Sequence, residues 1–360
     1  MRCRSSGIFR KLLIHEVRCR LANSVKKMAA LVTHVVITDK NLVEMQITRH
    51  IIQVAVFLLL ILIPLVNFYG IKVEQKDDYV IEESAPLSLI HSAFKGQERA
   101  KVIEMTHRVK GSVWTIDIFG YKMSDPLAVL ESTTTAMYFY APMLLSILAP
   151  VALTIIFGRV YCGWLCPMNF LLELNEKLRR LLERLKYDTR DVKFHRRTKY
   201  YVLAGGLAVA FLAGMPLLSL IYPPAVISRE IFYKIYNGFF SNGLFLIAAI
   251  CFFELILSRR WWCRYICPGG AVYEILSRFR LLKIKRNDLD CNHCGECVPV
   301  CPYDLKPMTR NLTAQCDQCG LCVSVCQPKA LKYTFPGVGR NANNGAGLHL
   351  HPMNPEGEQV

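Results

Sequence analysis

Four long apolar segments restrict the folds that this chain can adopt. They cover residues 51 to 71, 138 to 157, about 200 to 221 and about 239 to 257, and Glu254 is the one charged residue within them. At a rise of about 1.5 Å per residue, each segment can cross a hydrocarbon core of roughly 30 Å as a helix. A buried helix of a large soluble protein is the alternative for any one segment, but four in one chain favour a membrane. We therefore predict a mostly α-helical protein with four transmembrane helices.

The distribution of Lys and Arg predicts the orientation of these helices, because basic flanks stay on the cytoplasmic side. Residues 1 to 50 carry ten, residues 158 to 199 eleven and residues 258 to 360 thirteen, whereas residues 72 to 137 carry eight against ten acids and residues 222 to 238 carry two. We expect a multi-pass protein of the bacterial inner (cytoplasmic) membrane, with both termini cytoplasmic and an outer loop at 72 to 137. None of the fifteen cysteines falls in the two predicted outer segments, as expected for free thiols in a reducing compartment. The net charge of +16 follows from this asymmetry, and no nucleic-acid partner is expected.

Eight cysteines near the C-terminus repeat one spacing twice. Each run reads C-x2-C-x2-C-x3-C, from Cys291 to Cys301 and from Cys316 to Cys326. In bacterial ferredoxins, three closely spaced thiolates of such a run bind one 4Fe-4S cluster and the fourth binds the other cluster. Zinc sites built from two C-x-x-C pairs are the alternative, but they leave half of each run unexplained. We predict an α+β double-cluster ferredoxin-like domain at residues 286 to 335, with cluster 1 held by Cys291, Cys294, Cys297 and Cys326 and cluster 2 by Cys316, Cys319, Cys322 and Cys301.

An internal repeat supplies a second cysteine pattern. Residues 158 to 167 (GRVYCGWLCP) and 259 to 268 (RRWWCRYICP) align at a shift of 101, and each C-x3-C-P unit follows a predicted outward-to-inward helix. Cysteines four apart lie on one face of a helical turn and can share a metal. Alternatively, the Arg, Trp and Tyr residues anchor the helices at the membrane interface and the thiols only pack. Our hypothesis is an additional redox or metal site on the cytoplasmic side, formed by Cys162, Cys166, Cys263 and Cys267.

Other residues are weaker candidates for proton chemistry. Glu254 lies near the inner end of the fourth segment, while Asp125, Glu131, His107 and Glu230 lie on the predicted outer side, where such side chains usually face water. No C-x-x-C-H, no histidine pair within the apolar segments and no nucleotide-binding motif is present, so the sequence predicts neither a haem nor a nucleotide site. The Gly- and Asn-rich tail at 336 to 360 is expected to be disordered.

The four predicted helices, the two C-x3-C-P units and the double ferredoxin run together resemble the NapH/MauN family of membrane-bound ferredoxin-type proteins. The resemblance covers about residues 45 to 335, including Ser124-Asp125-Pro126-Leu127, so we expect translation to start downstream of Met1 or the extension before Met45 to be dispensable. It implies a quinol dehydrogenase subunit of the periplasmic nitrate reduction type, which relays electrons from the quinol pool toward a periplasmic iron-sulfur protein or multihaem cytochrome. Fold-level resemblance leaves two other roles open, an accessory protein for metalloenzyme maturation and an iron-sulfur redox sensor.

Overall fold

The computed structural model describes residues 41–75, 85–94, 98–107, 109–112, 115–118, 121–137, 141–184, 192–309 and 312–335. Most of the predicted basic N-terminal segment and the predicted tail at 336–360 lie outside these residues. Contacts divide the chain into two compact units, and the unit Val36–Tyr333 contains nearly every described residue. The other unit joins Met1–Val35 to Thr334–Val360, of which Thr334 and Phe335 are described.

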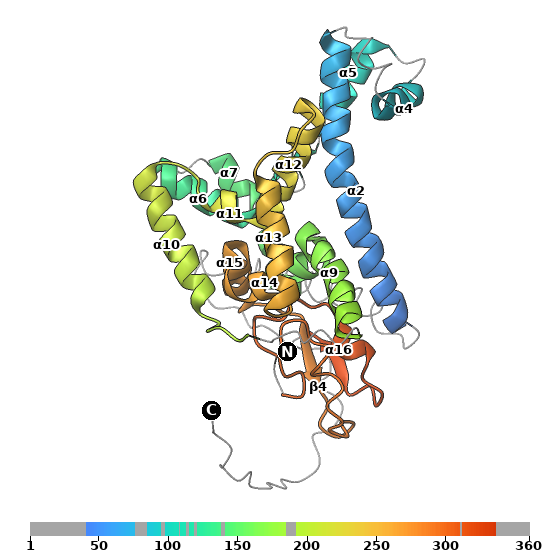
Figure 1. The fold of residues 1–360 in the computed structure, drawn as a ribbon, viewed down its shortest axis with the longest axis vertical. Coiled ribbons are helices and arrows are strands. Elements are labelled where there is room, and N and C mark those ends of the chain that lie inside the picture. The colour runs from blue at the N-terminus through green and yellow to red at the C-terminus, as the bar shows by residue number, and fades with distance from the viewer. Residues whose placement is uncertain are drawn as a thin grey trace, which may run out of the picture. The chain divides into compact units, whose positions relative to one another are not determined.

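The longest helix, α2 (Asn41–Gln75), begins the described chain. Its 35 residues span roughly 52 Å at 1.5 Å per residue, and it exposes an apolar side that includes Ile51, Leu58 and Leu62. Helices α4 (Ala85–Ala93) and α5 (Arg99–His107) pack near its C-terminal end around Tyr69, and they lie beside that end in Figure 1. A three-stranded antiparallel sheet follows, with the order β1 (Val109–Ser112), β2 (Thr115–Ile118), β3 (Tyr121–Ser124).

Two similar series of helices follow, each with one C-x3-C-P unit. The first comprises α6 (Pro126–Ala136), α7 (Ala141–Ser146), α8 (Leu148–Phe157), the π-helical turn η1 (Tyr161–Leu165) and α9 (Pro167–Arg184). The second comprises α10 (Thr198–Ala213), α11 (Leu218–Ile221), α12 (Pro223–Asn237), α13 (Gly243–Ile256), α14 (Trp261–Tyr265) and α15 (Pro268–Ser277).

The two series pack reciprocally rather than side by side. Helix α9, after the first cysteine pair, packs against α13 of the second series, and α15, after the second pair, packs against α8 of the first. The same exchange joins α6 to α10, and α12 packs against α2, which precedes both series. This crossed packing is the reason that two cysteine pairs 101 residues apart in the sequence meet in one place.

Among the described helices, α2 alone is both long and apolar enough to cross a membrane by itself. The other three predicted spans contain shorter apolar helices, at Ala141–Phe157, Thr198–Ala213 and Gly243–Ile256. The third segment stops early because Gly214 adopts a left-handed backbone conformation with φ of 63°, which caps α10 eight residues before the predicted end at 221.

Residues 222–238 differ from the simple outer loop expected from the sequence. They form α12, and its Val226 and Ile227 are buried against Leu60 of α2 and Met168 of α9. Two prolines at the start of α12 fix its first turn. The helix therefore turns back into the protein, and its N-terminus reaches the level of the C-x3-C-P units.

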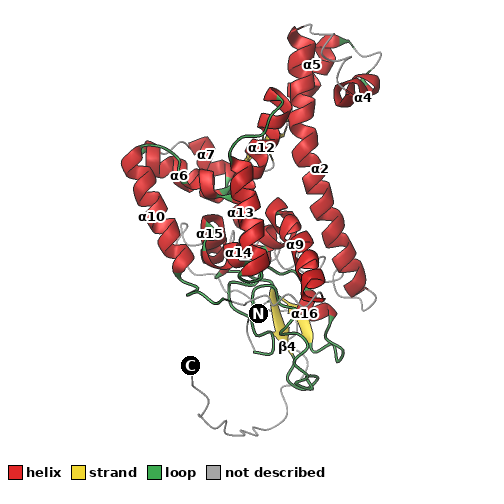
Figure 2. Ribbon diagram, in the orientation of Figure 1, coloured by secondary structure: helices red, strands yellow, loops and turns green. Residues whose placement is uncertain are grey.

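The ferredoxin run forms a small, loop-rich body closed by a two-stranded sheet of β4 (Lys283–Arg286) and β5 (Leu331–Thr334), with the short helix α16 (Leu321–Ser324) between them in sequence. Figure 2 shows its predominance of loop over regular structure. Positive φ angles recur at matching places in both cysteine runs, with a shift of 25 residues, at His293 and Gln318, Gly295 and Gly320, and Asp304 and Lys329. The two runs thus share one backbone fold.

Candidate metal centre

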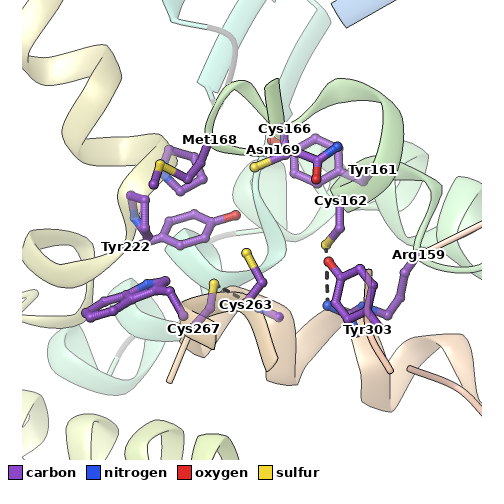
Figure 3. Close-up of a pocket in the computed structure, with 14 residues that line it drawn as sticks. Arg159, Tyr161, Cys162, Cys166, Met168, Asn169, Tyr222, Cys263, Cys267 and Tyr303 are labelled. Atoms are coloured by element: carbon purple, nitrogen blue, oxygen red, sulfur yellow. Dashed lines mark hydrogen bonds between the residues drawn. The ribbon is translucent and has the colours of Figure 1, made fainter. Parts of the chain in front are cut away.

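The four cysteines of the C-x3-C-P units line one cavity, which Figure 3 shows in close-up. Cys162 lies in η1 and Cys166 directly follows it, while Cys263 lies in α14 and Cys267 caps α15. Their sulfur atoms surround a shared space, and the backbone N–H of Gly270 donates a hydrogen bond of 3.3 Å to the Cys267 sulfur. The structure therefore brings together the four thiols that the repeat singled out.

The surroundings of this four-thiol cavity favour negative charge. Three helices, α9, α12 and α15, begin beside it, and each has proline in its first turn. Helix N-termini carry partial positive charge and exposed N–H groups. The guanidinium of Arg159 is fully buried, with Nη2 3.9 Å from the Cys162 sulfur. Both features would stabilise thiolates or an anionic cluster in the cavity.

The cavity has the donor set of a thiolate-ligated metal or cluster. Burial raises the pKa of the Cys267 thiol to about 12, so a thiolate here needs a cationic partner such as iron. Several buried polar atoms of residues that line the cavity, among them Asn169 Oδ1 and Trp262 Nε1, have no hydrogen-bond partner within the described residues. The void itself measures about 20 Å³, which is the size of one water molecule. The void is therefore too small for a cubane unless the thiol side chains turn outward. The four cysteine sulfur atoms are nevertheless the ligand type that a cubane binds.

Several contacts join this cavity to the ferredoxin run. Tyr303, two residues after the last cysteine of the first run, lines the cavity, and the Arg159 guanidinium lies 5.3 Å from the centre of its ring. Arg159 also donates a 3.1 Å hydrogen bond to the carbonyl of Gln315, and the indole N–H of Trp164 donates one of 3.2 Å to the carbonyl of Gln318. These bonds hold the second cysteine run against η1.

The closest approach occurs at Gly163. A Cβ atom on this residue would lie 2.5 Å from the backbone carbonyl oxygen of Asp317, next to Cys316. Only glycine allows the two backbones to come so near. The backbone of the second cysteine run is thus packed directly on the first C-x3-C-P unit.

The eight ferredoxin cysteines fall into two groups of neighbours. Burial raises the pKa of the Cys297 thiol, and nearby Cys326, Cys294 and Cys291 raise it further. Burial likewise raises the pKa of Cys322, and Cys316 and Cys301 are the thiols that add most to the shift, followed by Cys297 of the first group. Cys319 in turn interacts with Cys316 and Cys322. Each group contains three cysteines of one run and the fourth cysteine of the other, an arrangement that fits two cubanes.

Within the described part of the chain, no three Cys, His, Asp or Glu side chains converge closely enough to hold a single metal ion. A mononuclear zinc site draws its sulfur ligands to about 2.3 Å from one ion, whereas a cubane is a larger body with four separate iron corners.

The acidic residues selected from the sequence are buried, contrary to the expectation that those on the outer side face water. Asp125 caps α6 and Glu131 accepts hydrogen bonds from the backbone of Leu218 and Ser219, while Glu230 accepts one from Ser241. Glu254 accepts a 3.1 Å hydrogen bond from the backbone of Trp262, so it caps the turn before the second cysteine pair. The side chain of His107 is outside the described ones.

The repeat alignment places Glu173 opposite Glu274 in the sequence, but it does not by itself show that polar residues support the cavity. The repeat contains the matching pairs Arg159 and Arg260 and Glu173 and Glu274, and all four are largely buried. Arg260 lies 3.5 Å from Glu173, and Lys199 of α10 forms a buried ion pair with Glu274. The repeat alignment carried this signal, because charged residues at matching places beside two cysteine motifs indicate a shared internal role. Tyr303, in contrast, belongs to the ferredoxin run and has no counterpart in the repeat.

Comparison with known proteins supports an iron-sulfur function for the repeat. A family model described as a 4Fe-4S binding domain matches residues 140–186 and 241–287, which contain the two C-x3-C-P units. The chain is 32% identical over 204 residues to the methylamine utilization ferredoxin-type protein MauN of Methylorubrum extorquens, covering 55% of this chain and 68% of that protein. It is 28% identical to the ferredoxin-type protein NapH of Escherichia coli, covering 50% of this chain and 60% of NapH.

A MauN of Paracoccus denitrificans is 31% identical, and the match covers 50% of this chain and 61% of that protein. The chain thus spans about 60 to 68% of the length of these relatives. No solved structure matches it. The chain belongs to the NapH/MauN family of ferredoxin-type iron-sulfur electron-transfer proteins.

Proposed function

We propose that this protein relays single electrons between the quinone pool and a protein redox partner at the bacterial cytoplasmic membrane. The implied partner is a periplasmic iron-sulfur protein or multihaem cytochrome, as in quinol dehydrogenase systems. The observation that carries the proposal is the contact between the four-thiol cavity and the ferredoxin run, which share Arg159 and Tyr303. Redox centres in such contact can exchange electrons without a mobile carrier.

The proposed centres are two clusters in the ferredoxin run and a third redox or metal site in the four-thiol cavity. The ligands of the first two are the groups described above, Cys291, Cys294, Cys297 and Cys326, and Cys316, Cys319, Cys322 and Cys301. Bound 4Fe-4S clusters supply one-electron chemistry at a potential set by burial and hydrogen bonds to sulfur. The residues of this chain contribute the remainder: Arg159 and the helix N-termini stabilise negative charge, and the apolar walls exclude water.

The membrane location rests on exposed apolar side chains. Four described helices carry them: Leu58 and Leu62 on α2, Leu148 and Leu153 on α8, Val209 and Leu212 on α10, and Phe245 and Phe252 on α13. Exposed apolar surface on this scale indicates contact with lipid. We propose that the four apolar sequence segments that contain these helices cross the bilayer with both termini cytoplasmic, α2 as one long helix and the other three as shorter helices with the residues that adjoin them. Alkaline phosphatase fused after residue 137 should be active and a fusion after residue 186 inactive, and the reverse pattern would refute this orientation.

A cysteine substitution tests the relay. In membranes, Cys162→Ala or Cys263→Ala should abolish quinol-driven reduction of the ferredoxin clusters while dithionite still reduces them and membrane insertion is unchanged. Cys251→Ala is the matched control, because Cys251 lies on α13 outside the cavity lining. Full quinol-driven reduction in both cavity variants would remove the four-thiol cavity from the relay. A wild-type protein whose clusters no quinol reduces, with its partner proteins present, would favour a maturation role instead.

A further inference from the structure

A second cavity adjoins the four-thiol cavity at Tyr161. It has a volume of about 130 Å³ and is lined mainly by apolar side chains, among them Leu153 of α8 and Val160. Tyr161 lines both cavities. A cavity of about 150 Å³ in another protein binds benzene, so this one has room for a single six-membered ring.

One buried carboxylate lies in the wall of this second cavity. Asp125, just before α6, is 4% exposed and lines the cavity. Its Oδ2 accepts hydrogen bonds of 3.0 Å from the hydroxyl of Tyr222 and 3.2 Å from that of Tyr273, and its Oδ1 accepts one of 2.7 Å from the backbone of Leu127. Tyr222 lines the four-thiol cavity and Tyr273 lines the second one. The carboxylate therefore bridges the two cavities through its tyrosine partners.

The environment of Asp125 shifts its pKa toward neutral pH. Burial raises its pKa to about 6, although the hydrogen bonds from Leu127, Tyr222 and Tyr273 oppose the shift. The titratable groups that face it are Tyr161 of η1, Tyr222 before α12 and Tyr273 of α15, with the thiols of Cys162 and Cys267 further off. No Lys or Arg is among the groups that affect it most. Such a carboxylate can take up a proton and release it again near neutral pH.

An apolar helix forms one wall of the cavity. Pro150, Leu153 and Thr154 of α8 line it, and Leu148 and Leu153 on the same helix are exposed. Within the proposed membrane arrangement, a ligand dissolved in the hydrocarbon would reach the cavity along α8. An apolar pocket with one convergent acid is the form expected for an amphipathic ring compound.

We propose that this Asp125 pocket binds the ring of a quinol and that Asp125 accepts a proton from its hydroxyl. The proposal rests on the relay function above and adds the location of its substrate. Oxidation of one hydroquinone breaks two O–H bonds and releases two protons and two electrons. The first proton passes to the Asp125 carboxylate and the second to water, and the electrons leave singly to oxidised iron-sulfur centres, the acceptor class of the proposed relay.

Photolabelling of the purified full-length protein tests the location independently of turnover. A short-tailed azidobenzoquinone or azidonaphthoquinone should label peptides that contain residues 150–165 or Tyr273, and unlabelled quinone should compete. Leu153→Trp should remove the label by filling the pocket, whereas Leu212→Trp, on the exposed face of α10, should leave it unchanged. Labelling elsewhere in the wild type, or competition by phospholipid as strong as that by quinone, would overturn the proposal.

Asp125→Asn tests the proton acceptor separately from binding. The amide keeps an acceptor for Leu127 N–H but cannot take a proton, so labelling should persist while quinol-driven cluster reduction falls at least about 100-fold and loses its pH dependence near 6. An unchanged rate in this variant would remove Asp125 from the chemistry. If quinol reduces the wild-type clusters but Leu153→Trp and Asp125→Asn behave like the wild type, the proposed quinol site is wrong and the proposed relay function stands. If quinol reduces no cluster although the pocket is labelled, the proposed relay function is wrong.

Discussion

Replacing Gly163 by alanine should separate the ferredoxin run from the first C-x3-C-P unit. The added Cβ would lie 2.5 Å from the carbonyl oxygen of Asp317, about 1 Å closer than ordinary van der Waals contact allows. Because the opposing atom is backbone, no side-chain rotation relieves the clash. The segment that contains Cys316 and Cys319 must move, which strains the hydrogen bonds from Trp164 to Gln318 and from Gln46 to Cys319.

Overpacking of this kind costs about 1 to 3 kcal/mol. For a chain of this size, that corresponds to a fall of a few degrees in the apparent unfolding midpoint. We expect two effects in detergent: a lower midpoint for loss of the ferredoxin cluster absorbance, and slower electron exchange between the four-thiol cavity and the second cluster. Both arise from the same displacement of the Cys316 segment.

Gly205→Ala is the matched control. No atom lies within 4 Å of a Cβ built on Gly205, which sits inside α10. Alanine there should raise stability by up to about 1 kcal/mol, because glycine is the weaker helix former. If Gly163→Ala matches Gly205→Ala in both midpoint and electron exchange, the close packing of η1 on the ferredoxin run is refuted.

Three further predictions follow from individual residues. Cys301→Ala should disrupt the cluster of Cys316, Cys319 and Cys322 more than that of its own run, as read from iron content and electron paramagnetic resonance; loss confined to the Cys291 cluster would refute crossed ligation. Protonation of Asp125 should favour the folded state, because burial raises its pKa from 3.8 to about 6. Its contribution to stability is fully present below pH 3.8 and falls by roughly 3 kcal/mol as the pH rises through 6. This pH dependence should be absent from Asp125→Asn and should therefore remain in the difference between wild type and variant; a difference that does not change with pH would refute it. Lys199→Met should cost about 3 to 5 kcal/mol by leaving the buried Glu274 charge unpaired, and the double variant with Glu274→Gln should recover most of it; equal loss in both would show that the pair does not couple.

The sequence by itself determined the features that depend on local spacing. The C-x2-C-x2-C-x3-C runs predict loops that wrap a cluster, because neighbouring thiolates must reach one small body. The repeat at a shift of 101 predicts two equivalent cysteine turns, and the structure brings their thiols to one cavity. The apolar part of helix α2, residues 51 to 71, is readable in the same way, since an uninterrupted apolar stretch has few alternatives to a long helix, whereas the extension of α2 to Asn41 and Gln75 is not.

Only the tertiary structure decided how the distant parts meet. Hydrophobic periodicity indicates that a helix has an apolar side, but it does not indicate which other helix covers that side. For this reason the sequence did not predict the packing of α9 on α13 and of α15 on α8, or the inward turn of α12. Burial of Asp125 depends on Tyr222 and Tyr273, which lie 97 and 148 residues away in sequence. A carboxylate that local sequence assigns to water becomes an internal acid because partners from two other elements enclose it and remove that water.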